Sequence, residues 1–116
     1  MALDYLRSRY PELPFTLAGF SFGSRIALRI ACEGIGSRRV IAVGFPTVYK
    51  DRGYLEGCGV PRIFVQSTQD EFGPIADLEA VLGLLPEPKK LIQIPASDHF
   101  FTGALEELES AIASLV

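Results

Sequence analysis

Residues 19–23 read Gly-Phe-Ser-Phe-Gly, a G-x-S-x-G pattern with Ser21 at its centre. A short apolar run precedes the pattern and an apolar stripe at helical spacing follows it, so the serine is predicted on a tight strand-to-helix turn. Such a turn presents the hydroxyl above the sheet as a nucleophile, and the backbone N–H of Phe22 then faces a developing oxyanion. The alternative is a glycine-rich turn in which Ser21 only caps the helix. The strand and the helix on either side favour the nucleophile.

A serine nucleophile needs a base, and the chain has one histidine, His99. It follows a predicted strand at 91–94 and precedes the last predicted helix, which places it at the carboxyl edge of a parallel sheet. Ser21 emerges at the same edge, where such sheets bind their ligands. A lone histidine is more often a surface or packing residue, but this position favours a general base.

The base in turn needs a carboxylate that fixes its tautomer. Asp70 comes directly after a predicted strand at 62–66 and supplies that acid. Its alternative role is a turn or cap residue ahead of the following helix. Asp98 is a weaker candidate, because adjacent side chains in a loop rarely align for a carboxylate–imidazole bond, and Glu71 is the other one.

The elements that must position these residues alternate between strand and helix. Apolar runs predict four strands, at 15–20, 40–45, 62–66 and 91–94. Apolar stripes at helical spacing predict helices near 3–10, 26–31, 75–85 and 105–115, the last one capped by Thr102. Strands that are apolar throughout are covered on both faces, and strands that alternate with helices are joined by parallel crossovers. We expect an α/β fold: an open, mostly parallel four-stranded sheet with helices on both faces.

Composition narrows the class of protein further. The 116 residues predict one domain over 1–116, and a net charge of −3 without a basic block argues against nucleic acid or a membrane as partner. The apolar runs are far shorter than the ~20 residues that span a bilayer. Cys32 and Cys58 make no metal-binding pattern with the histidine, so both are predicted to be reduced thiols that mainly pack. We therefore expect a cytoplasmic protein without a signal peptide, metal site or disulfide.

The sequence resembles the serine α/β-hydrolases, above all their small bacterial esterase-like and dienelactone-hydrolase-like members. The resembling segments are the turn at 17–23, the acid segment at 64–74 and the base segment at 95–101. They follow the family's order of nucleophile, acid and base. The resemblance implies that Ser21 is the nucleophile, Asp70 the acid and His99 the general base. It also implies acyl transfer from a small ester to water, through a covalent acyl-enzyme and without a cofactor.

Only the carboxyl-terminal portion of that family is represented in this chain. The family's further strands precede the turn, and one of their loops gives the second oxyanion N–H. Two hypotheses follow: a minimal esterase with slow turnover, or a truncated hydrolase remnant that acts as a structural or interaction module. The strand at 15–20 would then be an uncharged edge, so we expect a homodimer that pairs two copies of it; the alternative is a separate partner chain that supplies the missing strands. The loop at 47–60 either roofs the substrate pocket or is solvated.

Overall fold

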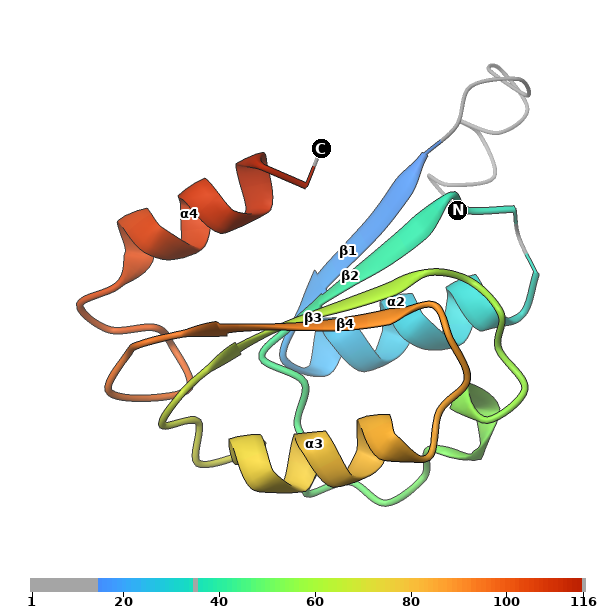
Figure 1. Cartoon of the computed structure of the whole chain (residues 1–116), viewed down its shortest axis with the longest axis horizontal. Coiled ribbons are helices and arrows are strands. Elements are labelled where there is room, and N and C mark those ends of the chain that lie inside the picture. Colours follow the sequence, from blue (N-terminus) through green and yellow to red (C-terminus); the bar gives the residue numbers. More distant parts are fainter. Residues whose placement is uncertain (1–14, 35, 116) are drawn as a thin grey trace.

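The computed structural model describes residues 15–34 and 36–115, which form one four-stranded parallel sheet (Figure 1). Its strands lie side by side in chain order: β1 (Thr16–Phe20), β2 (Arg39–Val43), β3 (Arg62–Ser67) and β4 (Lys89–Ile94). The expected α/β architecture with a parallel sheet is confirmed. The predicted helix near 3–10 lies outside the described residues.

Helices cover both faces of the sheet, as predicted (Figure 1). On one face lie α2 (Phe22–Cys32), α3 (Ile75–Gly83) and the short 3-10 helix η1 (Gly53–Leu55); on the other lies α4 (Leu105–Ala113). Each face has its own hydrophobic core. The larger core joins α2 and α3 to the sheet through residues such as Leu28, Phe64 and Leu78, and the smaller one packs Ile41, Val65 and Phe101 beside α4.

The burial of each strand explains its sequence. The inner strand β2 is buried from Val40 through Val43, since helices cover both of its faces. The outer strands β1 and β4 are only half-buried, with Ala18 and Phe20 exposed on β1. Consequently the apolar runs located β2 and β3 well. They missed the first two residues of β4, Lys89 and Lys90, whose charged side chains hid the start of that strand.

Two predicted ends differ in the structure. The strand predicted at 40–45 stops at Val43, because Gly44 has a positive φ of 65° that turns the chain. Thr102 does not cap the last helix: Ala104 occupies the N-cap position, and the Thr102 hydroxyl donates to the Asp98 carboxylate at 2.7 Å instead. The prediction of the cap was wrong because Asp98 offered that hydroxyl a stronger, charged acceptor.

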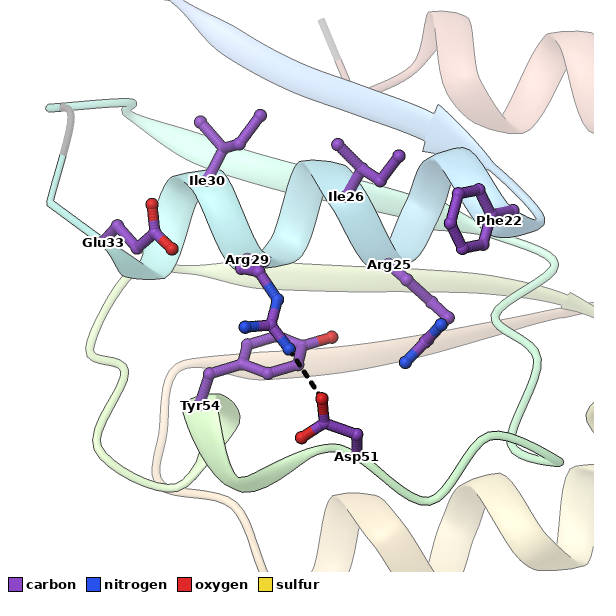
Figure 2. A pocket seen from close by; sticks show the side chains of 8 residues that line it. All are labelled: Phe22, Arg25, Ile26, Arg29, Ile30, Glu33, Asp51 and Tyr54. Carbon is purple, nitrogen blue, oxygen red and sulfur yellow. Dashed lines mark hydrogen bonds and ion pairs between the residues drawn. The ribbon is translucent and has the colours of Figure 1, made fainter.

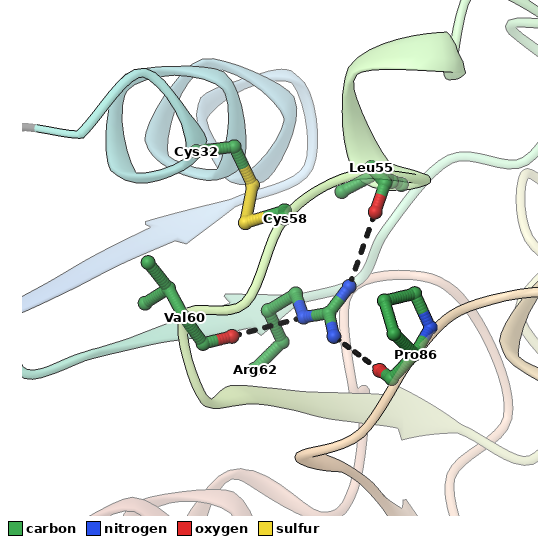
Figure 3. Close-up of a disulfide and its surroundings, with 6 residues drawn as sticks. All are labelled: Cys32, Leu55, Cys58, Val60, Arg62 and Pro86. Atoms are coloured by element: carbon green, nitrogen blue, oxygen red, sulfur yellow. Dashed lines mark hydrogen bonds between the residues drawn. A yellow bond between two sulfur atoms is a disulfide. The ribbon is translucent and has the colours of Figure 1, made fainter.

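The prediction of two reduced, unpaired cysteines was wrong, because Cys32 and Cys58 form a disulfide (Figure 3). Cys32 is the last residue of α2, and the chain after η1 returns beneath that end of the helix, so the two Cα atoms lie 5.1 Å apart. A separation of 26 residues gave no hint of this contact. The cytoplasmic location was predicted in part from reduced cysteines. Because disulfides persist mainly in oxidising compartments, the cysteines no longer support that location, which stays a prediction.

A buried arginine stabilises the same corner of the molecule (Figure 3). Arg62, at the start of β3, is 1% exposed and donates hydrogen bonds to three backbone carbonyl oxygens, those of Val60, Leu55 and Pro86. Burial lowers the pKa of its guanidinium, although Glu87 opposes this change. A buried charge is tolerated when its donors are satisfied in this way. Arg62 thus connects the η1 loop to the chain before β4.

Candidate active site

Ser21 lies on a sharp turn between β1 and α2, in a backbone conformation that serine rarely adopts. Its φ is +57° and its ψ −122°, and its N–H donates to the Val43 carbonyl oxygen at 2.8 Å. A Cβ atom at Gly19 would overlap the carbonyl group of Gly23, so only glycine fits there, whereas the space around Gly23 itself is open. The Ser21 side chain makes no cap hydrogen bond. Strain at a single residue of this kind is typical of functional sites.

Three predicted site residues meet at the carboxyl edge of the sheet. The Ser21 hydroxyl oxygen is 2.8 Å from Nε2 of His99, and Nδ1 of His99 is 2.7 Å from the Asp70 carboxylate. His99 and Asp70 are each only 2% exposed. With a carboxylate beside Nδ1, we assign the proton to that nitrogen, whose N–H donates a hydrogen bond to Asp70. Nε2 is then free to accept a hydrogen bond from the serine hydroxyl.

The Asp70 carboxylate is held by its own loop. Its other oxygen accepts hydrogen bonds from the backbone N–H groups of Phe72 and Gly73, at 2.9 and 2.8 Å. The buried amide of Gln66 fixes that loop from below: it accepts from the Phe45 N–H at 2.9 Å and donates to the carbonyl oxygens of Phe45 and Gly73. With both oxygens engaged, Asp70 presents one fixed acceptor to the histidine.

The two alternative acids take other positions. The Asp98 carboxylate accepts from the N–H groups of Phe100 and Thr102 and from the Thr102 hydroxyl, and these hydrogen bonds lower its pKa. The Glu71 carboxylate accepts from the backbone N–H of His99 at 3.0 Å. Both groups therefore support the histidine loop, and among the described residues the carboxylate that forms a hydrogen bond with the imidazole is that of Asp70.

Aromatic rings enclose the imidazole on three sides. Phe20 stacks on it with ring centroids 5.2 Å apart, while Phe72 and Phe100 meet it edge-on at 4.9 and 5.1 Å. A Cβ atom at Gly44 would come within 3.1 Å of the imidazole Cε1, so a glycine leaves room for the histidine. Sequence reasoning missed Gln66, Gly44 and these rings. The three phenylalanines could have been found from the sequence, because each lies within two residues of Ser21, Asp70 or His99.

The Phe22 amide begins α2, and the first N–H groups of a helix have no partner within that helix. It directly follows Ser21, so it is available to an oxygen anion formed at the serine, and the positive end of the helix dipole favours such an anion. The role predicted for Phe22 at the oxyanion stays a prediction.

The loop at 47–60 packs along the flank of α2 (Figure 2). Arg29 pairs with Asp51 at 3.0 Å and lies over the Tyr54 ring, and Leu55 is fully buried. A cavity of about 360 Å³ opens there between the outer surface of α2 and the loop. Burial raises the pKa of Tyr54, against the opposing effect of Arg25 and Arg29. The part of the loop at 51–55 therefore packs against α2.

Comparison with solved structures identifies the fold. An α/β serine hydrolase homologue from Coxiella burnetii aligns with 99% of the chain at a TM-score of 0.88 and 26% identity. An α/β serine hydrolase without a lid from Xanthomonas campestris aligns with 95% at 0.80 and 25%, and a dienelactone hydrolase from Anabaena variabilis with 97% at 0.79 and 24%. No family profile matches the sequence, and a search of curated proteins found no match.

These similarities, together with the strand order and the turn at Ser21, define the class of protein: the chain has an α/β-hydrolase fold. Its structural neighbours are α/β serine hydrolases and a dienelactone hydrolase, as the resemblance in the sequence predicted. The chain spans about half the length of these structures, between 50% and 55%. Among residues 15–34 and 36–115, the helices are too short or too polar to cross a bilayer.

Proposed function

We propose that the chain carries the catalytic residues of a serine hydrolase that cleaves small carboxylic esters. The observation that supports this most strongly is the unbroken series of hydrogen bonds from Ser21 through His99 to Asp70. The backbone strain at Ser21 and the burial of the other two residues agree with it. The proposed reaction is acyl transfer to water without a cofactor.

In the proposed reaction, His99 Nε2 takes the Ser21 proton while the serine oxygen attacks the ester carbonyl carbon. The carbonyl oxygen becomes an anion facing the Phe22 N–H, and Asp70 stabilises the imidazolium. The intermediate then breaks its bond to the alcohol oxygen, which takes the proton from Nε2 and leaves. Water attacks the acyl-serine in the same way, giving its proton to His99, and the acid leaves as the Ser21 oxygen regains a proton.

Turnover of p-nitrophenyl acetate tests the proposal. We expect a kcat/KM below the ordinary range, which begins near ~10⁴ M⁻¹s⁻¹, because the Phe22 N–H is the one oxyanion donor identified among the described residues, and a missing donor costs on the order of 10²–10³ in kcat. Ser21→Ala should abolish release of p-nitrophenol. Ser97→Ala is the matched control, since the Ser97 hydroxyl only donates to the Thr102 carbonyl oxygen. Equal rates for wild type and Ser21→Ala would refute the nucleophile.

A second candidate function, a dimerising module, is favoured by the outer strand β1. Within the described residues, β1 has a hydrogen-bonded neighbour on one side only, β2. It carries no charged residue, and the exposed side chains of Phe22 and Ile26 lie beside it on α2. Unprotected edges of this kind pair with other strands, and two-fold dimers are the commonest closed assembly. We propose antiparallel pairing of β1 with its copy.

Removing one outward N–H tests this pairing. Ser21 donates to β2 and Phe15 accepts from it, so by alternation the N–H of Ala18 points to the open edge. Light scattering after size exclusion should give a dimer for the wild type and for Ala18→Val, and a monomer for Ala18→Pro. A wild type that is monomeric at micromolar concentration, or a dimer that survives Ala18→Pro, would exclude this interface.

A further inference from the structure

We propose that Phe20, Phe72 and Phe100 form a binding surface for the alcohol part of an uncharged ester, with preference for a planar aromatic or bulky apolar group. This inference rests on the proposed hydrolase function and adds to it the class of substrate. The three rings are called the aromatic collar below. They come from three separate places in the fold: the end of β1, the loop after β3 and the loop after β4.

The aromatic collar shields the His99 imidazole from solvent, while its own three rings are partly exposed. His99 is 2% exposed, whereas Phe20 and Phe72 are each 43% exposed and Phe100 is 61% exposed. Phe20 also lies 6.2 Å from Phe100, centroid to centroid, so the rings are contiguous. Exposing several large apolar side chains in one patch is unfavourable in water and marks an interaction site. The faces not used against His99 are therefore available to a ligand.

Other exposed apolar side chains, some of them aromatic, lie near this end of the sheet. Val48 and Tyr49, which follow β2, are about half exposed, and the Val48 N–H donates to the carbonyl oxygen of Phe72 at 3.2 Å. Phe22 is 57% exposed directly after the serine. Exposed apolar side chains thus lie next to the serine as well as around the histidine, which favours a substrate over an unrelated partner.

The chemistry decides which part of the ester meets the aromatic collar. His99 Nε2 must give its proton to the leaving alcohol oxygen, so that oxygen lies within hydrogen-bond distance of Nε2. The carbonyl oxygen faces the Phe22 amide instead. Because the aromatic collar surrounds the imidazole, the carbon group beyond the alcohol oxygen is the part that contacts Phe20, Phe72 and Phe100.

The charges around the aromatic collar favour a neutral group. Glu71 and Asp98 lie on the two loops that carry Phe72 and Phe100, and both are tied by hydrogen bonds to the histidine loop. Hydrogen bonds from Thr102 and Phe100 lower the pKa of Asp98. A carboxylate on the alcohol group would meet these two negative charges, and like charges repel. We therefore expect esters of anionic alcohols to react slowly.

Acetates of different alcohols test the inference, because the acyl group stays constant. Benzyl and ethyl alcohol leave with similar ease, so benzyl acetate against ethyl acetate measures contact with the aromatic collar. We expect a preference in kcat/KM of roughly tenfold for benzyl acetate, the size of one good aromatic contact. The preference should fall to about twofold in Phe100→Ala, and 4-carboxybenzyl acetate should react more slowly than benzyl acetate. Leu84→Ala, at an 80% exposed apolar residue after α3, is the control.

Labelling of Ser21 by a fluorophosphonate separates failure of this inference from failure of the proposed function. Labelled protein with equal rates for benzyl and ethyl acetate, or with a preference that Phe100→Ala leaves unchanged, would overturn the inference alone. Absence of labelling would overturn the function and the inference with it. If ester turnover is too slow to compare, benzyl alcohol should slow the labelling more than ethanol does, and equal protection would again overturn the inference.

Discussion

Replacing Asp70 with asparagine is expected to slow the reaction of Ser21 with a fluorophosphonate by about 10⁴-fold, the loss in kcat that the corresponding change causes in a serine protease. The side-chain carbonyl of the introduced asparagine would keep accepting from the Phe72 and Gly73 N–H groups, as the corresponding Asp70 oxygen does now. Its NH₂ group then faces Nδ1 of His99. That nitrogen must become the acceptor, so the proton moves to Nε2, which can no longer take a proton from the serine.

Two matched variants control this measurement. Asp98→Asn and Glu71→Gln change carboxylates on the same pair of loops, but their hydrogen bonds go to the backbone around His99 and to the Thr102 hydroxyl. We expect their labelling rates to stay within about tenfold of the wild type, since the imidazole keeps its partner. If Asp98→Asn were slowed as much as Asp70→Asn, or if Asp70→Asn kept more than a tenth of the wild-type rate, Asp70 would not be the acid.

The parts of the fold that the sequence predicts well are those set by local chemistry. Apolar runs locate the inner strands, because a strand covered on both faces needs no alternation of polar residues. The order of Ser21, Asp70 and His99 along the chain, each at the end of a strand, was enough to predict that they meet. Parallel strands bring all such ends to one edge, so long separations in sequence become short distances there.

The features that sequence reasoning missed depend on contacts between distant segments. Cys32 and Cys58 pair only because the chain after η1 returns beneath the end of α2, which no spacing rule reveals. The Gln66 side chain forms hydrogen bonds with the backbone of Phe45, which follows the neighbouring strand. No pattern in the sequence marks this glutamine as a residue that holds the loop. Thr102 was assigned to the helix because the competing carboxylate of Asp98 becomes visible only once the loop is folded.

The three residues of the candidate site are all present in this chain, whereas the similar structures are about twice as long. All three residues of the Ser21–His99–Asp70 series lie within the described residues, on loops that follow β1, β3 and β4. The chain nevertheless spans only about half the length of the similar structures. Activation of the serine needs only the hydrogen bonds already present, whereas fast turnover also needs a second oxyanion donor. We therefore expect chemical reactivity of Ser21 to exceed catalytic efficiency.

Intact-mass and peptide mass spectrometry after reaction with a fluorophosphonate tests the activation of Ser21 most directly. We expect one adduct per chain, located on Ser21, with no adduct in Ser21→Ala and a rate at least about 10³-fold lower in His99→Ala, because the hydroxyl loses its base. Ser97→Ala should label like the wild type. An unmodified wild-type chain, an adduct on another serine, or equal labelling of His99→Ala would contradict an activated Ser21.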